Sequence, residues 1–245
     1  LYGDWREELV LRASDSRGSY ASGDAAKELW RLELGKGYYS VIVAGNRVYT
    51  MGNIQNQDIV YCLDTAEGGK AVWKYSYPCK AADYPGPRST PALDENRLYT
   101  FSRAGDLLCL DAASGSVVWS RALGQEQAAS PPGWGFASSP LIYKNMAIVN
   151  AGTSGMAFEK SSGKTIWKSG NGGASYAAPV SYLQQGKPMV AIFAGKAIHG
   201  VDADSGAVAW SFPWETAYDV HAAVPVLIGD EKLFFSSGYN HGCAM

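Results

Sequence analysis

The segment LDAASGSVVW, residues 110–119, recurs along the chain and decides its fold. Close copies are LDTAEGGKAVW at residues 63–73, FEKSSGKTIW at residues 158–167 and VDADSGAVAW at residues 201–210. A degenerate fifth copy ends at Trp30. The tryptophans that close the copies, separated by 43, 46, 48 and 43 residues, are Trp30, Trp73, Trp119, Trp167 and Trp210. Self-similarity at such a period indicates a repeat architecture, either a solenoid, a propeller or an array.

Each copy has the pattern of a β-hairpin. Apolar residues lead to an Asp, a turn of small polar residues contains a Gly, and a second apolar run ends in Trp. The Gly supplies the positive φ that such turns require. The recurring Asp is expected to accept hydrogen bonds from backbone N–H groups of the turn, which assigns structural roles to Asp64, Asp111 and Asp202. Glu159 replaces the Asp in one copy, where we expect a looser turn.

A second pair of strands precedes each hairpin. It opens with small residues that end in Pro, as at residues 88–91 and 137–140, and it continues through a polar turn such as residues 94–96. An alternating strand follows, for example residues 97–101. Four short strands in each period, without a helical 3.6-residue periodicity, predict an all-β propeller of four-stranded antiparallel blades. About four to five blades are covered by this chain.

Composition excludes several classes of protein. Hydrophobic residues make up 47% of the 245 residues and charged residues 18%, which provides a core and excludes intrinsic disorder. The formal net charge of −2 offers no general basic face, so no nucleic-acid partner is expected. No apolar run approaches the roughly 18 residues of a transmembrane helix. No signal peptide is visible, and the chain begins at Leu1 rather than Met.

The cysteines give no sign of a metal or haem site. Cys62, Cys79, Cys109 and Cys243 form no C-x-x-C motif and no adjacent pair. Cys62 and Cys109 occupy matching positions before the repeat Asp, where small buried apolar residues are expected. The sequence therefore predicts no metal site.

The repeat resembles that of the pyrroloquinoline-quinone-type β-propellers. The resemblance covers residues 23–245 and rests on a small-Ser-Pro segment, a polar turn, Leu-x-x-Leu-Asp, a Ser/Thr-Gly turn and a terminal Trp. This family includes quinoprotein alcohol dehydrogenases and the periplasmic propeller lipoprotein of outer-membrane protein assembly. The resemblance implies that each repeat tryptophan, from Trp30 to Trp210, docks against the neighbouring blade and has a structural role.

The resemblance also implies a larger ring. Propellers of this family close with about six to eight blades, more than the repeats in this chain supply. We expect residues 1–245 to form one incomplete propeller domain whose last blade is truncated. Further blades would come from the same chain or another chain, because an open ring would leave exposed sheet edges.

Two classes of function follow from the resemblance. The first is a non-catalytic scaffold, periplasmic or secreted, with or without a lipid anchor, that binds a protein or a glycan. The second is a quinoprotein-like oxidoreductase of the alcohol dehydrogenase type, with pyrroloquinoline quinone and calcium as cofactors and its catalytic residues outside this sequence. No vicinal cysteine pair, calcium ligand or catalytic Asp of those enzymes can be matched here. This favours the scaffold, for which no catalytic residue and no cofactor are predicted.

The loops that enter the first strand of each blade form the candidate ligand site. In a propeller these strands line the axis, and the loops before them form the rim of a funnel. Each loop carries an aromatic residue, and the candidate residues are Tyr39, Tyr84, Arg88, Trp134, Phe136, Tyr176 and His221. Arg88 offers a planar fork for a carboxylate, and His221 would make binding pH-sensitive near a pKa of about 6.5. The alternative is that these side chains only fill the channel.

Overall fold

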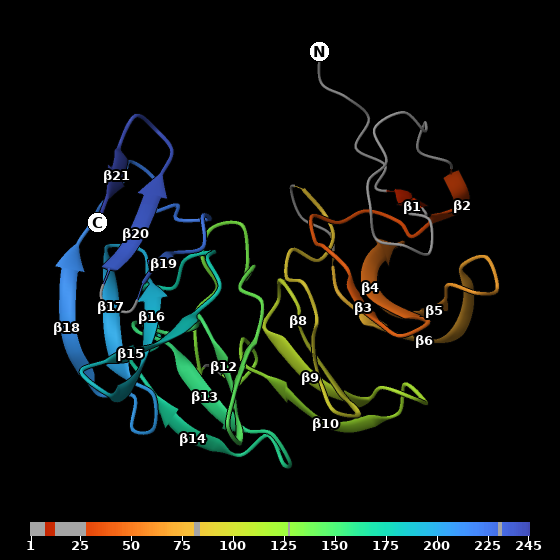
Figure 1. Ribbon diagram of the computed structural model, residues 1–245, viewed down its shortest axis with the longest axis horizontal. Helices are drawn as coiled ribbons and strands as arrows, with labels where there is room; N and C mark the ends of the chain where they lie inside the picture. Colours follow the sequence, from red (N-terminus) through yellow and green to blue (C-terminus); the bar gives the residue numbers. More distant parts are fainter. Residues whose placement is uncertain (1–7, 13–27, 81–83, 127, 230–231) are drawn as a thin grey trace.

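The protein is a series of antiparallel β-sheets. The computed structural model describes residues 8–12, 28–80, 84–126, 128–229 and 232–245 (Figure 1). Within these ranges the secondary structure elements are all β-strands. Strands that follow one another in the sequence are neighbours in each sheet. This is the up-and-down order of propeller blades, and it confirms the all-β, four-stranded antiparallel architecture predicted from the repeat.

Four of the sheets in the described residues have four strands, and we number them as blades. Blade 1 contains β3 (Ile42–Ala44), β4 (Arg47–Ile54), β5 (Gln57–Asp64) and β6 (Lys70–Pro78). Blade 2 contains β7 (Ala92–Asp94), β8 (Arg97–Phe101), β9 (Asp106–Asp111) and β10 (Val117–Ala122). Blade 3 contains β11 (Leu141–Tyr143), β12 (Met146–Val149), β13 (Met156–Glu159) and β14 (Thr165–Lys168). Blade 4 contains β15 (Val180–Gln184), β16 (Lys187–Phe193), β17 (Ala197–Asp202) and β18 (Val208–Pro213).

Two smaller sheets flank the blades. The hairpin of β1 (Glu8–Arg12) and β2 (Glu28–Glu33) precedes blade 1, and it carries Trp30 on its second strand. A sheet of β19 (Val226–Ile228), β20 (Lys232–Ser237) and β21 (Gly242–Ala244) follows blade 4. The sheets succeed one another around an arc (Figure 1). Among the first strands of the blades, β11 contacts both β7 and β15.

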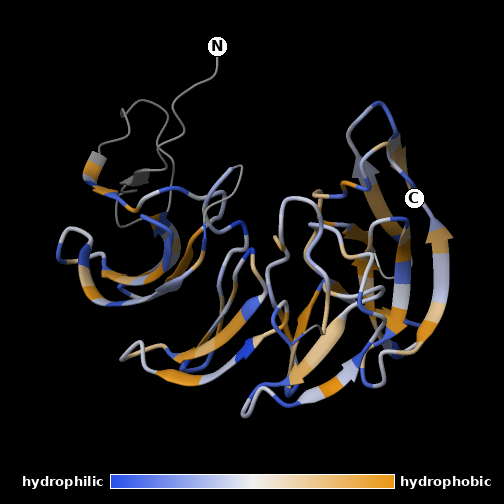
Figure 2. Cartoon of the chain, turned by 180° about the vertical axis from the view of Figure 1, so that it is seen from behind, coloured by the Kyte–Doolittle hydropathy of each residue, from blue (hydrophilic) through white to orange (hydrophobic). Residues whose placement is uncertain are grey.

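The hydrophobic core lies between the blades rather than at one centre. On β9, Leu108 and Leu110 pack with residues of blade 1, whereas Leu107 and Cys109 pack with residues of blade 3. Successive side chains of a strand point to opposite faces, so an uninterrupted apolar run buries both faces of a blade. Apolar residues accordingly follow the strands in Figure 2, and polar residues concentrate at the turns.

The tryptophan at the end of a blade lies against the turn of the next blade. Trp119 of blade 2 donates its indole Nε1–H to the Lys160 carbonyl of blade 3 at 2.8 Å. Its ring covers Gly163, where an added Cβ would stand 2.6 Å from the indole. The same pair of contacts joins Trp73 to Ala112 and Gly115, and Trp167 to Ala203 and Gly206.

The two terminal copies differ. Trp30 faces the turn of blade 1 between β5 and β6, which is one residue longer than the same turn in the other blades. The second glycine of this turn, Gly69, lies under the indole ring of Trp30. Trp30 Nε1 has no hydrogen-bond partner among the described residues. Trp210 donates instead to the hydroxyl of Tyr182 within its own blade, at 2.9 Å.

The repeat Asp organises the turn before the last strand. Asp111 Oδ1 accepts the backbone N–H of Ser114 at 2.9 Å and its hydroxyl at 3.0 Å. Both hydrogen bonds lower the pKa of Asp111, and the bond from the Ser114 hydroxyl has the larger effect. Glu159 receives the Ser162 hydroxyl instead, while the turn keeps its backbone bond from Gly163 N–H to the Glu159 carbonyl. The difference therefore lies in the side-chain bonds and leaves this backbone bond in place. Equivalent bonds to turn N–H groups are made by Asp202 and Asp64.

We predict that Gly163→Ala destabilises the protein much more than Gly45→Ala. Both glycines have positive φ, 70° and 56°, so both variants meet the cost of a left-handed backbone. Only Gly163 faces an indole, whereas nothing lies within 4 Å of a Cβ at Gly45. The additional loss should be about 1–3 kcal/mol, the usual cost of overpacking, measured by urea unfolding. Equal losses would show that the ring has room to move.

We predict that Trp119→Ala lowers the free energy of unfolding by roughly 3–5 kcal/mol, because the indole is 8% exposed and packs in the core between blades 2 and 3. The matched control is Trp134→Ala, whose indole is 42% exposed and should cost under about 1 kcal/mol. Both values come from urea unfolding followed by circular dichroism. A large loss at Trp134 would place that residue in the packed core instead.

Candidate functional site

Two adjoining cavities lie at the inner edge of the arc. The first, of about 420 Å³, is lined by the segments that enter five successive sheets. The second, of about 270 Å³, shares three of its residues and adds Tyr84. We call the large side chains around both cavities the axial site, which consists of Tyr38, Tyr84, Arg88, Trp134 and Tyr176. Small residues of the inner segments, such as Ala137 and Ser139, line the rest of the first cavity.

The structure brings together four of the seven residues that the sequence nominated, Tyr84, Arg88, Trp134 and Tyr176. Tyr84 and Arg88 lie in the segment before blade 2, Trp134 in the segment before blade 3 and Tyr176 in the segment before blade 4. Successive blades therefore present them to one place, as the position of these loops in a propeller requires. The remaining three, Tyr39, Phe136 and His221, lie elsewhere.

Trp134 is held outward by the residues that follow it. Gly135 has a φ of 85°, and a Cβ there would stand 2.6 Å from the Arg103 carbonyl. The next N–H, of Phe136, donates to that same carbonyl at 2.9 Å. The Phe136 ring is fully buried 4.9 Å from the ring of Phe101, which corrects its assignment to the funnel. Phe136 anchors the loop, and the tight turn at Gly135 leaves Trp134 exposed.

A tyrosine hydroxyl joins two of these loops. Trp134 donates its backbone N–H to the hydroxyl of Tyr176 at 3.3 Å, and the two rings lie 5.9 Å apart. Because the two residues enter blades 3 and 4, this contact fixes the distance between their loops. The rings consequently form one continuous aromatic wall of the first cavity.

Tyr38, rather than the predicted Tyr39, belongs to the axial site. Tyr38 is 42% exposed and lines both cavities, whereas Tyr39 is half-buried and packs against Gly37. The backbone N–H of Tyr38 donates to the Pro87 carbonyl at 2.8 Å, which ties the segment before blade 1 to the segment before blade 2. Neighbouring side chains of an extended segment point in opposite directions, so a one-residue error exchanges the inward and outward residue.

Arg88 places a guanidinium between the aromatic rings. Its Nη2 donates to the Tyr84 carbonyl at 2.7 Å, and its Cζ lies 5.5 Å from the centre of the Tyr38 ring. Burial, and then the charge of nearby Arg103, lower the pKa of Arg88. An arginine nevertheless stays charged at neutral pH, so the axial site is cationic.

His221 is a buried structural residue, which corrects its assignment to the funnel. The ring is fully buried and stacks on Phe193 at 4.2 Å. Its Nε2 lies 2.9 Å from the Gly195 carbonyl and its Nδ1 lies 2.7 Å from the Ser237 hydroxyl, so the neutral ring donates through Nε2 and accepts through Nδ1. Burial lowers the pKa of His221, which favours this neutral form.

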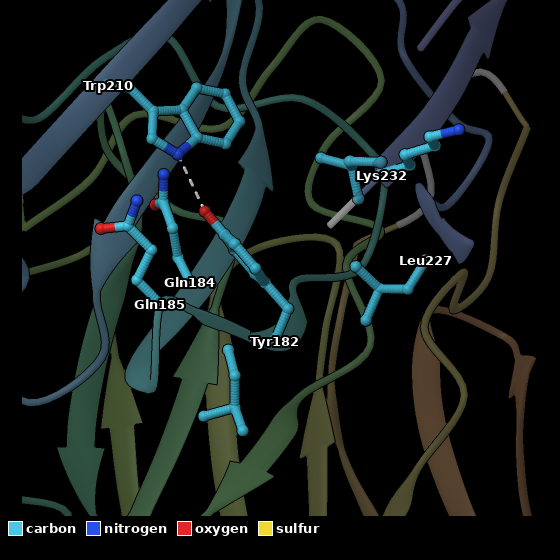
Figure 3. A pocket seen from close by; sticks show the side chains of 8 residues that line it. Tyr182, Gln184, Gln185, Trp210, Leu227 and Lys232 are labelled. Atoms are coloured by element: carbon cyan, nitrogen blue, oxygen red, sulfur yellow. Dashed lines mark hydrogen bonds between the residues drawn. The ribbon is translucent and has the colours of Figure 1, made fainter. Parts of the chain in front are cut away.

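A larger cavity, of about 560 Å³, lies beside Trp210 between blade 4 and the β19–β21 sheet. Figure 3 shows the Tyr182 hydroxyl accepting the indole N–H of Trp210 there. In the preceding blades the equivalent indole is covered by a glycine-containing turn. The cavity thus lies where, in the preceding blades, a turn of the next blade contacts the tryptophan.

The described residues do not fit a calcium-bound quinone. They contain no group of three or more His, Cys, Asp or Glu side chains that could hold a metal ion. The residues lining the two axial cavities are aromatic, aliphatic, hydroxyl-bearing or cationic, with no carboxylate among them. Calcium prefers carboxylate and carbonyl oxygens, and the side chains that line these cavities supply no carboxylate for it.

Comparison with known proteins supplies the family. The profile of the family described as outer membrane protein assembly factor BamB matches residues 55–244. The chain belongs to the BamB family. This confirms the resemblance to propellers of the pyrroloquinoline-quinone type. No curated protein matches the sequence.

Solved structures of BamB and of quinohemoproteins share the fold. BamB from Moraxella catarrhalis superposes with a TM-score of 0.57 at 19% identity, over 80% of this chain and 57% of that chain. Quinohemoprotein alcohol dehydrogenase from Comamonas testosteroni gives 0.58 at 14% identity, over 83% and 40%. The enzyme ADHIIG from Pseudomonas putida HK5 gives 0.58 at 17% identity, over 84% and 40%.

This chain therefore spans little more than half of the BamB structure and 40% of each dehydrogenase. At these identities the likeness shows the fold alone. Within the residues that the structure describes, no helix could span a membrane.

We predict that stability falls as the pH drops below about 6.5 and that His221→Gln reduces this fall. Because burial lowers the folded pKa of His221, the unfolded chain binds more protons as the pH drops through the ordinary histidine range. The measurement is the difference in melting temperature between pH 7.5 and pH 5.5. The charge of His241 lowers the pKa of His221 further, so His241→Gln should reduce the fall only in part. An unchanged difference in His221→Gln would assign the pH dependence to other groups.

Proposed function

We propose that this chain is part of a non-catalytic propeller scaffold that works outside the cytoplasm, in the periplasm or as a secreted protein, and binds a protein partner. The axial site carries this proposal. It combines exposed aromatic side chains, Tyr38, Tyr84 and Trp134, with one charged guanidinium. Tyr, Trp and Arg are the residue types that dominate the energetics of protein interfaces.

The membership of the BamB family supports a scaffold rather than an enzyme, since that family is described as an assembly factor. The large side chains of the axial site supply stacking surfaces and hydrogen-bond donors but no carboxylate, carboxamide or thiol. A carboxylate that could act as a general base and a thiol that could act as a nucleophile are therefore missing from the described part of this site. The same lack of carboxylates and carboxamides favours a protein over a glycan, because these groups are common partners of sugar hydroxyl groups.

We predict that a photo-crosslinking amino acid at position 134 of the full-length protein captures a discrete protein partner in living cells. The control is the same amino acid at Val118 on the outer strand β10, because Val118 is 40% exposed and Trp134 is 42% exposed. Adducts are detected as a shifted band on an immunoblot and located by cell fractionation. A band specific to position 134 in the cell envelope or the medium is expected.

The absence of any band at position 134, or equal bands at both positions, would contradict binding at the axial site. A specific band found only in the cytoplasmic fraction would contradict the proposed location. Wild-type protein without the crosslinker controls for spontaneous adducts.

A further inference from the structure

Arg88 forms no ion pair with an acidic side chain among the described residues, unlike three other arginines. Arg47 pairs with Asp64, Arg97 with Asp111, and Arg121 with Glu126. Within the part of the chain that the structure describes, the Arg88 guanidinium donates a hydrogen bond only through Nη2, to a backbone carbonyl, and its covered Nη1 has no hydrogen-bond partner. A buried donor without a partner is unfavourable, so a ligand that supplies an acceptor would be favoured.

A second positive charge lies close by. Arg103 influences the pKa of Arg88, and its Nη1 donates to the Lys80 carbonyl at 3.0 Å. Its Nε is also buried without a partner. The two positive charges repel, and no described carboxylate forms an ion pair with either guanidinium, although the charge of Arg103 also acts on the buried Asp58. This local positive charge occurs in a chain whose net charge is −2, so the axial site attracts anions against the sign of the whole chain.

The aromatic residues select the kind of anion. Trp134, Tyr84 and Tyr38 surround the guanidinium, and their exposed fractions are 42%, 63% and 42%. Such rings bind apolar or planar groups on either side of the charge. A free inorganic anion would leave these rings without a contact. A carboxylate carried between apolar side chains would use both the charge and the rings.

We propose that the axial site binds an acidic segment of a polypeptide, in which a Glu or Asp carboxylate meets Arg88 and flanking apolar side chains pack on Trp134, Tyr84 and Tyr38. This inference rests on the proposed function, and it specifies the chemistry of the partner. The planar guanidinium suits a carboxylate because it can offer two parallel N–H donors. Binding in this way requires the guanidinium to turn so that the covered Nη1 reaches the cavity that Arg88 lines.

The test is a thermodynamic cycle with two peptides and two proteins. The peptides are N-acetyl-Gly-Phe-Glu-Phe-Gly-amide and its Gln counterpart, which differ in one charge and carry no other carboxylate. The proteins are the full-length wild type and Arg88→Gln, and affinities are measured by isothermal titration calorimetry at constant salt. We expect the wild type to bind the Glu peptide about tenfold more tightly than the Gln peptide, and Arg88→Gln to bind both equally weakly.

Two further variants make the cycle specific. Arg88→Lys keeps the charge but loses the fork, so it should retain only part of the preference for Glu. Arg97→Gln removes an arginine that is already paired with Asp111, and the preference should stay unchanged. Melting temperatures within a few degrees of the wild type establish that each variant is folded, and Arg88→Lys replaces Arg88→Gln if the latter is not.

Equal binding of the two peptides by the wild type, or no binding of either, would overturn this inference. It would leave the proposed function standing if position 134 still captures a partner in cells. A third probe, the Gln peptide with a free C-terminal carboxylate, separates the two sources of a carboxylate. Binding of this probe alone would overturn an internal acidic residue as the ligand, because it would assign recognition to a chain terminus.

Discussion

The contact between an indole and the glycine of the next blade sets the spacing of the sheets. The Trp119 ring lies so close to Gly163 that a Cβ there would clash with it, and its Nε1–H donates to the Lys160 carbonyl, three residues earlier in the same turn. A ring that must satisfy both contacts permits little sliding or tilting of blade 3 on blade 2. Since both faces of each blade are buried, the apolar residues can interdigitate only at the separation that this contact enforces.

Fixed spacing at the outer edge determines what happens at the axis. Backbone contacts join the segments that enter the blades across blade boundaries, as between Tyr38 and Pro87. The hydrogen bond from the Trp134 N–H to the Tyr176 hydroxyl spans the boundary between blades 3 and 4. The axial side chains are thereby positioned by several blades at once. None of the residues in the indole contacts of blades 1 to 3 lines the axial cavities, so stability and binding reside in separate sets of residues.

The blades could be predicted from the sequence because their signal repeats. A pattern seen several times, with apolar alternation and a glycine at a fixed place, leaves little freedom in strand order. The axial segments are irregular and have no such periodicity, so only their neighbourhood could be predicted. Whether Tyr38 or Tyr39 faces the cavity depends on backbone torsions that the residue types do not encode. Phe136 and His221 stand in the right loops, but the Gly135 turn directs Phe136 inward and partners on distant strands bury His221.

The buried His221 still matters for the axial site, through its backbone. Its carbonyl accepts the N–H of Tyr176 at 3.2 Å, and the Tyr176 hydroxyl in turn accepts the N–H of Trp134. The segment entering the β19–β21 sheet thus supports the segment entering blade 4, which supports the loop of blade 3. The rings of Trp134 and Tyr176 come from segments that enter consecutive blades. They form one wall of the cavity because each segment is hydrogen-bonded to the segment that enters the following sheet. An aromatic surface built in this way keeps its shape without a large local core, which suits a site that must present bulky side chains to a partner.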